Sequence, residues 1–250
     1  MMPRPGGTAF RTLSLLGFVV VWQVVAELVN SPTLPAPTVV FTNLWDHLWS
    51  GELLFHLGVT LSRVAVAFVL AMGIGTAIGI LMGRYRSLDN ALDGLLVLAL
   101  NIPALVTIIL CYIWFGLIEA AAVAAVAVNK IPTVVVTVRE GARAVDRKLL
   151  EVADAFQLEA FRKLTKIYLP QLYPYLMAAA RSGLALIWKI VLVVELLGRS
   201  TGIGFQLGTF FQFFDITSIL AYTLAFAAVI LVIEAVVMRP IDARISQWRT

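Results

Sequence analysis

The chain has 250 residues, of which 60% are hydrophobic and only 14% are charged. Soluble globular proteins carry about 25% charged residues, so this composition excludes an ordinary soluble domain and indicates a protein of the lipid bilayer. The net charge of +4 is small, and no nucleic-acid partner is expected. A single cysteine, Cys111, excludes an internal disulfide.

The sequence contains no motif for chemistry of its own. His47 and His56 are the only histidines, and neither has a cysteine beside it, so a metal site is not expected. There is no GxxxxGK[ST] phosphate loop and no Gly-x-Ser-x-Gly elbow. The chain is therefore not expected to hydrolyse ATP or an ester by itself.

Six segments are apolar enough to cross a bilayer, which requires about 20 residues per helix. They are residues 13–29, 57–83, 91–110, 118–138, 172–197 and 218–238. We therefore predict an all-α bundle of six transmembrane helices in one domain that covers residues 1–250. The first segment could instead be a cleaved signal peptide, because Arg4 and Arg11 precede it. It is long for that role, and no clear cleavage site follows.

Two features of the first half predict packing and placement. Residues 30–56 contain several prolines and then an amphipathic run with Trp45 and Trp49, which suit a membrane interface. This run predicts a short helix lying flat on the outer surface, with a packed loop as the alternative. The second span carries Gly75, Gly79 and Gly83, and small residues at every fourth position let another helix approach closely.

The basic residues set the orientation, because cytoplasmic loops carry an excess of lysine and arginine. With six spans, both termini share one side. That side holds most of the 19 basic residues: Arg4, Arg11, Arg84, Arg86, Arg139, Arg143, Arg147, Lys148, Arg162, Lys163, Lys166, Arg239, Arg244 and Arg249. The opposite side holds only Arg199. The sequence therefore predicts cytoplasmic termini and a cytoplasmic connection between spans four and five.

That connection contains a polar stretch, EVADAFQLEAFRKLTKIYLP, at residues 151–170. If residues 151–167 form one helix, the apolar side chains share one face: Val152, Phe156, Ala160, Leu164 and Ile167. Glu159 is then placed to pair with Lys163. Pro170 is expected to stop or bend the helix before span five. Such a helix either caps the bundle or docks a cytoplasmic partner.

The same stretch resembles the EAA motif of ABC importer permeases: Glu-Ala-Ala, three residues, Gly, nine residues, Ile, one residue, Leu-Pro. The matching residues are Glu151, Ala153, Ile167, Leu169 and Pro170. Val152 replaces the first alanine and Gln157 replaces the glycine. PALVTIILCYIWFGL and GLALIWKIVLVVELLGRSTGIGFQL resemble the subgroup that serves taurine, alkanesulfonates, nitrate and thiamine precursors. The resemblance covers the chain from about residue 35 to its end.

The resemblance implies a transport subunit of the bacterial inner membrane that is not an enzyme. In that family two permease subunits form the translocation pathway, and two cytoplasmic ATPase subunits dock on them. A periplasmic binding protein delivers a small solute. A homodimer of permeases is the default assembly here. ATP and magnesium are expected in the ATPase, so this chain itself needs no cofactor and no metal.

The resemblance also assigns coupling to the ATPase to a set of residues: Glu151, Ala153, Phe156, Gln157, Ala160, Ile167, Leu169 and Pro170. Glu151 is expected to be the polar anchor, either capping the helix or meeting an ATPase arginine. Ala153, Phe156 and Ala160 are expected to contact a groove on the ATPase. The family glycine permits a turn, whereas Gln157 disfavours a positive φ angle. We therefore expect one straighter helix, or a turn at another residue.

Charged residues inside spans are candidates for the pathway or its gate, because an ionised side chain there usually faces a partner or a wet cavity. We predict that Arg63 and Glu195 lie close together and help to close an outer gate. The alternative is that Arg63 alone extends to the outer surface.

Lys189 has two interpretations of equal weight. On the pathway it would favour a substrate with a carboxylate, sulfonate or phosphate group. As a structural residue it would bond a backbone carbonyl or a carboxylate such as Glu119 or Glu234. The adjacent Trp188 is expected to pack against a neighbouring helix.

Two other classes of function also fit parts of the sequence. Six spans with charges inside them would also fit a secondary transporter or channel that works without ATP. Inverted internal repeats would favour that function, and none is convincing. An integral membrane enzyme is disfavoured, because the spans lack clustered carboxylates and a cysteine pair.

Overall fold

The computed structural model describes residues 6–238, and in this part of the chain all regular structure is helical. The all-α prediction is thus confirmed. The helices in chain order are α1 (Gly6–Val29), α2 (Pro37–Trp49), α3 (Glu52–Arg84), α4 (Arg86–Asn101), α5 (Ala104–Phe115), α6 (Glu119–Arg143), α7 (Arg147–Ala155), α8 (Ala160–Lys163), the π-helix η1 (Leu164–Tyr168), α9 (Leu169–Gly198), α10 (Ile203–Gln212), α11 (Ile216–Ile233) and the π-helix η2 (Glu234–Met238).

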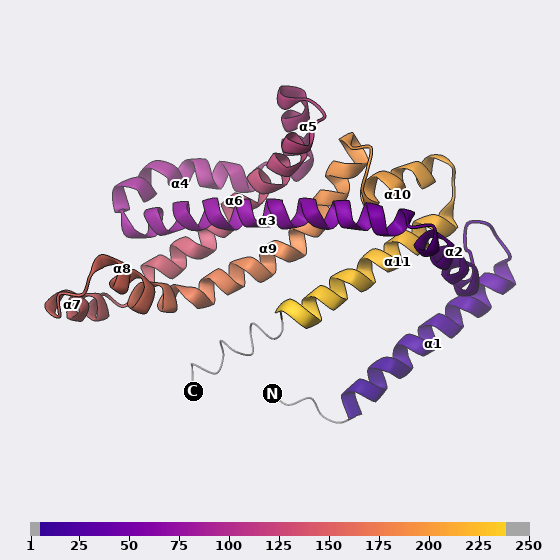
Figure 1. Ribbon diagram of the computed structural model, residues 1–250, viewed down its shortest axis with the longest axis horizontal. Helices are drawn as coiled ribbons and strands as arrows, with labels where there is room; N and C mark the ends of the chain where they lie inside the picture. Colours follow the sequence, from indigo (N-terminus) through magenta and orange to yellow (C-terminus); the bar gives the residue numbers. More distant parts are fainter. Residues whose placement is uncertain (1–5, 239–250) are drawn as a thin grey trace.

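Three long helices, α3, α6 and α9, form the centre of the bundle, and α6 packs along both of the others (Figure 1). Glycines of α3 make the contact with α6 close. A Cβ atom on Gly79 would lie 2.8 Å from Cβ of Val138 and 2.9 Å from the carbonyl oxygen of Val135. The glycine stripe therefore serves helix packing, as the sequence predicts.

Four helical segments of the described chain are long and apolar enough to cross a bilayer on their own. They are Glu52–Arg84, Glu119–Arg143, Ala160–Gly198 and Ile216–Val236. These segments contain most of predicted spans two, four, five and six. The apolar part of α1, Leu13–Val29, is a shorter helix, and α4 with α5 could form one further, broken span. Six complete spans therefore remain a prediction.

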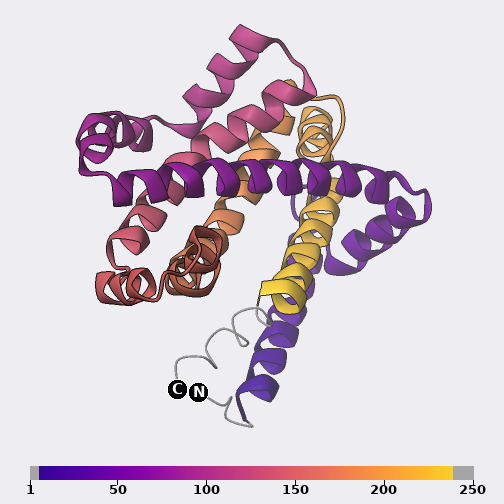
Figure 2. The same ribbon diagram turned by 60° about the vertical axis from the view of Figure 1, so that its left-hand side comes forward.

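The prediction of one straight span over residues 91–110 is wrong. α4 ends at Asn101, α5 begins at Ala104, and the two axes differ by 99°. Pro103 explains the break, because it lacks an N–H group and disfavours helical geometry in the residue before it. Ile102 accordingly has φ −73° and ψ 122°. In Figure 2, α5 extends away from α4 as a separate arm.

The two ends of the bundle carry different short helices. α2 and α10 lie at one end, called the α10 end below, and α7 and α8 lie at the other, the α7 end (Figure 1). The helical conformation of α2 agrees with the short helix predicted there. Its Trp45 and Trp49 rings are exposed and stacked, with centroids 6.1 Å apart. That α2 lies flat on a membrane surface stays a prediction.

The main hydrophobic core lies nearer the α10 end, where side chains of α9 meet those of α11. Ile187, Val191 and Tyr222 are fully buried there. Trp188 packs edge-on against Phe226 of α11, with ring centroids 6.0 Å apart. This contact confirms that Trp188 packs against a neighbouring helix.

Candidate functional site

The polar stretch forms a helix-turn-helix that we call the coupling segment, residues 147–168. α7 begins after Asp146, whose carboxylate accepts a hydrogen bond from the backbone N–H of Lys148 at 2.9 Å. Asp146 is therefore the cap of α7. Of the two roles expected for Glu151, capping is wrong, and contact with an ATPase arginine stays a prediction. The prediction of one helix over residues 151–167 is also wrong, because α7 ends at Ala155 and α8 begins at Ala160.

The turn lies at Gln157, which has a φ angle of 52°. The backbone N–H groups of Gln157 and Leu158 bond back to the carbonyls of Asp154 and Ala153, at 2.9 and 3.0 Å. We expected the glutamine to straighten the helix or to move the turn, and this expectation is wrong. The turn falls on the residue that aligns with the glycine of the EAA motif. A left-handed conformation costs a non-glycine residue roughly 1–2 kcal/mol.

An ion pair across the turn contributes to holding it. Lys163 Nζ of α8 contacts Asp154 Oδ1 of α7. The predicted Glu159–Lys163 pair is therefore not formed, and Glu159 instead lies 4.0 Å from Arg162. This cross-turn pair ties α8 back to α7 and helps to fix the conformation of Gln157.

The turn breaks the single apolar face predicted for a straight helix. Phe156 is 77% exposed and Phe161 is 74% exposed, whereas Ala153 is 1% exposed. The methyl group of Ala153 packs inside this chain, so in this conformation it is not available for the predicted contact with an ATPase. The exposed rings of Phe156 and Phe161 beside it are accessible to a partner protein.

A shallow apolar groove of about 590 Å³ runs beside α7. Its lining includes four of the residues predicted for coupling, Ala153, Phe156, Ile167 and Pro170. Leu169 lies half-buried at the start of α9. Of the two effects expected of Pro170, stopping the helix is wrong, because residues Ala160–Gly198 continue as one helical segment with the π-helical turn η1 just before the proline. A bend there stays a prediction.

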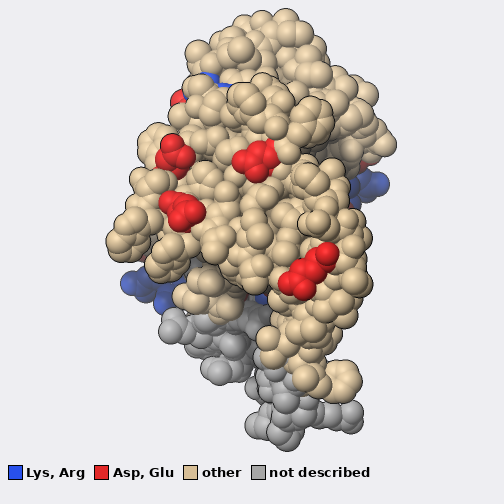
Figure 3. All heavy atoms as spheres, turned by 90° about the vertical axis from the view of Figure 1, so that its right-hand side faces the viewer, with Lys and Arg blue, Asp and Glu red and all other residues tan. Residues whose placement is uncertain are grey.

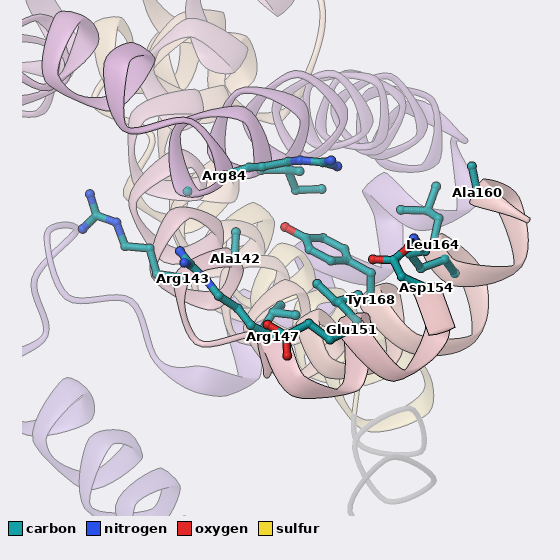
Figure 4. Close-up of a pocket in the computed structure, with 14 residues that line it drawn as sticks. Arg84, Ala142, Arg143, Arg147, Glu151, Asp154, Ala160, Leu164 and Tyr168 are labelled. Carbon is teal, nitrogen blue, oxygen red and sulfur yellow. Dashed lines mark hydrogen bonds and ion pairs between the residues drawn. The ribbon is translucent and has the colours of Figure 1, made fainter. Parts of the chain in front are cut away.

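A second, larger pocket of about 630 Å³ lies between the coupling segment and the ends of α3 and α6 (Figure 4). Glu151 and Ala160, two further residues predicted for coupling, line this pocket. Both are exposed. The coupling segment is thus flanked by a hollow on each side.

The α10 end contains a buried network of charges. Arg63, 4% exposed, donates to Glu195, which is fully buried, at 2.7 Å. These two side chains are therefore close, as the sequence predicts, whereas their role in a gate stays a prediction. Arg63 also forms a two-bond pair with Glu119, at 2.6 and 2.9 Å. Sequence reasoning considered Glu119 only as a partner of Lys189, because its distance to Arg63 is set by the fold.

The same network holds the start of α10. Glu195 accepts hydrogen bonds from Thr60 at 2.9 Å and from the backbone N–H of Gly204 at 2.8 Å. The backbone N–H of Gly202 donates to His56 Nδ1 at 2.9 Å. Gly202 has a φ angle of 110°, and a Cβ atom there would overlap the Glu195 carboxylate. Thr60 and His56 were missed as members of this site, since each is an ordinary polar residue in the sequence.

Lys189 lies exposed on α9. In the part of the chain that the structure describes, it has no ion pair or hydrogen bond. One carboxylate named for its structural role, Glu119, is already bonded to Arg63 and to Arg199, each at 2.6 Å. The structure thus brings together Arg63 and Glu195 but leaves Lys189 apart from them.

Long apolar helices around a buried charge network, with an exposed helix-turn-helix connecting two of them, define a polytopic membrane protein. Residues 75–245 match the family described as the binding-protein-dependent transport system inner membrane component. The chain belongs to this family. It is therefore an ABC transporter permease subunit of an importer family.

Relatives of known description agree with this family. The putative aliphatic sulfonates transport permease protein SsuC of Bacillus subtilis is 30% identical over 92% of this chain and 84% of its own length. The taurine transport system permease protein TauC of Escherichia coli is 25% identical over 95% and 88%. The bicarbonate transport system permease protein CmpB of Synechococcus elongatus is 27% identical over 88% and 83%.

Solved structures share the fold. A chain from inward-facing conformations of the MetNI methionine ABC transporter has a TM-score of 0.63 and 15% identity, covering 80% of this chain and 98% of that one. A chain from an amino acid ABC transporter has a TM-score of 0.59 and 18% identity, covering 82% and 96%. At this identity the likeness supports the fold alone.

Proposed function

We propose that this chain forms the translocation pathway of an ATP-driven importer and receives the driving motion from a separate ATPase through its coupling segment. The observation that carries the proposal is the exposed Phe156, 77% accessible, at the rim of an apolar groove of about 590 Å³. An exposed apolar patch away from lipid marks a binding surface for another protein. The segment joins α6 to α9, so a push on it reaches two central helices.

The assembly follows from the family. Two copies of this permease form the pathway, two ATPase subunits dock on the coupling segments, and a periplasmic binding protein delivers the solute. ATP and magnesium bind to the ATPase, which explains why this sequence has no phosphate loop. The chain is then a transport subunit without catalytic chemistry.

The charge distribution supports an orientation with the α7 end in the cytoplasm. Figure 3 looks at the α10 end of the bundle, where Asp and Glu patches face the viewer and Lys and Arg appear at the margins. At the α7 end lie several basic residues: Arg84, Arg143, Arg147, Lys148, Arg162, Lys163 and Lys166. Such asymmetry is typical of a cytoplasmic α7 end and a periplasmic α10 end.

The substrate that fits best is a small anion. The named relatives transport sulfonates, taurine and bicarbonate. Lys189 offers an exposed cation on α9, one of the central helices. A cation on the pathway would attract a sulfonate or carboxylate through charge-assisted hydrogen bonds. Passage must be rapid, so this site should bind weakly and the binding protein should set most of the specificity.

Lys189→Met tests the substrate class, because it keeps the apolar stem and removes the charge. We expect lower uptake of the anion carried by the cognate binding protein, with basal ATP hydrolysis near normal. Lys189→Arg is the matched control and should retain most of the uptake. Unchanged uptake by Lys189→Met, or a cationic ligand in the binding protein, would show that the lysine is structural.

Phe156→Asp and Glu151→Lys test the docking. The tagged permease should co-purify with an ATPase whose hydrolysis increases when the loaded binding protein is added. Both variants should insert into the membrane normally but lose the ATPase and abolish uptake. Uptake that persists without any ATPase would instead indicate a secondary transporter.

A further inference from the structure

The larger pocket at the α7 end has the dimensions of a ligand site. Its volume is about 630 Å³, within the roughly 300–1,000 Å³ that small-molecule sites occupy. Residues of α3, α6, α7, α8 and η1 all contribute to its walls. A ligand there would touch both the coupling segment and the bundle.

The pocket is lined by four basic side chains but only two carboxylates, Glu151 and Asp154, so basic charge is in excess there. Two of the four basic side chains are paired: Arg143 with Asp89 and Glu140, and Lys163 with Asp154. The other two, Arg84 and Arg147, have no ion pair among the described residues. Arg84 lies over the ring of Tyr85, 5.6 Å from its centroid, a contact that leaves the N–H donors of the guanidinium available.

A tyrosine adds an unused polar group to the same pocket. The Tyr168 hydroxyl is buried and, within residues 6–238, has no hydrogen-bond partner. Figure 4 shows the Tyr168 ring reaching into the space between Arg84 and Arg147. A buried hydroxyl without a partner costs free energy, and nearly all such groups in folded proteins are satisfied. Among the described residues this hydroxyl, like that of Tyr222 at the α10 end, is therefore a donor without an acceptor.

We propose that this pocket binds an oxyanion, with the guanidinium groups of Arg84 and Arg147 and the Tyr168 hydroxyl as donors. Planar guanidinium groups bond phosphate through two parallel N–H donors. Apolar side chains, Ile80, Leu150 and Leu164, form other parts of the wall and suit the glycerol region of a phospholipid. Basic pockets at the ends of transmembrane helices bind anionic headgroups. The phosphate comes either from such a headgroup or from free phosphate.

Occupancy would have a mechanical consequence. Arg84 ends α3, whereas Arg147 begins α7 and Tyr168 ends η1. An oxyanion bonded to all three would restrain the coupling segment against the bundle. The inference does not depend on the proposed ATPase partner, because each of these donors belongs to this chain.

Two probes test the site on the full-length chain purified in a neutral detergent. Binding of inorganic phosphate is measured by equilibrium dialysis. Binding of phosphatidylglycerol is measured by native mass spectrometry, as the lipid retained on the protein, with phosphatidylcholine as the reference lipid. We expect saturable binding of at least one probe. Arg84→Gln with Arg147→Gln should weaken it about tenfold or more, and Tyr168→Phe about tenfold, because a hydrogen bond to a charged group is removed.

The matched control is Arg86→Gln with Lys148→Gln, which removes the same charge from positions one or two residues away that do not line the pocket. It should leave binding unchanged. Binding of phosphate alone identifies a free oxyanion, and binding of phosphatidylglycerol alone identifies a headgroup; both outcomes support the site. The proposal is overturned if neither probe saturates or if both double variants weaken binding equally. No ATPase is present in this assay, so its failure would leave the proposed function standing.

Discussion

The α10 end and the α7 end differ in how their charged side chains are paired. At the α10 end, Arg63 and the fully buried Glu195 are bonded to each other and to further partners from three other segments. At the α7 end, Phe156 is exposed, Arg147 is unpaired among the described residues, and the Tyr168 hydroxyl lacks a partner there. The charged side chains of the α10 network are ion-paired within the described residues, although the Tyr222 hydroxyl and Arg199 Nε there have no hydrogen-bond partner. The α7 end presents an exposed aromatic ring and an unpaired cation that another molecule can bind.

This difference assigns a structural role to the polar groups of the α10 end and a binding role to those of the α7 end. A buried charge network in which every member is bonded fixes the relative positions of the helices that supply it. Exposed aromatic rings and unpaired cations contribute little to the fold and can be retained for binding. We therefore expect substitutions at the α10 end to act on stability and those at the α7 end to act on assembly.

Arg63→Met should have the largest effect on stability. It leaves Glu195 as a buried charge without its counter-ion, and breaking a buried pair in this way costs about 3–5 kcal/mol. The free energy of unfolding in detergent, measured with denaturant, checks the value. Arg162→Met, at an exposed position of the α7 end, is the control and should change it by less than about 1 kcal/mol. Equal losses at both positions would remove the contrast between the ends.

Gly202→Ala should have the next largest effect. The backbone at φ 110° and ψ 168° belongs to a region that only glycine adopts readily, and the added methyl group would overlap the Glu195 carboxylate. The backbone strain alone costs about 1–3 kcal/mol. Gly73→Ala is the control, because nothing lies within 4 Å of its Cβ position. A lower midpoint of thermal unfolding for Gly202→Ala only is the expected result, and equal midpoints would contradict it.

Gln157→Gly should have the smallest effect and the opposite sign. Removal of the strain of a left-handed φ angle raises the free energy of unfolding by roughly 1–2 kcal/mol. The greater freedom of glycine in the unfolded chain lowers it by about 0.5–1 kcal/mol. A net gain of about 0.5 kcal/mol with unchanged uptake is expected from unfolding curves and transport assays. A loss of stability would indicate that the glutamine side chain itself holds the turn.

Much of this fold could be predicted from apolar runs, and the errors have local causes. Residues 91–110 were predicted as one span because they are almost continuously apolar. The helix breaks there by 99°, because Pro103 lacks an N–H group. Gln157 was judged by its intrinsic preference alone. Its positive φ is supported by the Lys163–Asp154 pair and the buried Ala153, which are contacts that form only once the chain turns.

The candidate site shows the same limit. The coupling segment could be found because the EAA-like motif that overlaps it is contiguous, with Glu151 and Pro170 at fixed spacing. The Arg63–Glu195 contact could be predicted because both charges lie inside apolar spans. Glu119 and Thr201, which also bond Arg63, come from other segments, and only the folded chain shows that they meet.

Site-specific photo-cross-linking tests the central claim most directly, by comparing the two ends in one complex. A photoreactive phenylalanine analogue replaces Phe156 at the α7 end or, in a separate variant, Phe213 at the α10 end; the two side chains are 77% and 78% exposed. In membranes that contain the whole transporter, the analogue at position 156 should cross-link to the ATPase, and the analogue at position 213 should not. Cross-linking of the ATPase at position 213, or at neither position, would contradict coupling through residues 147–168.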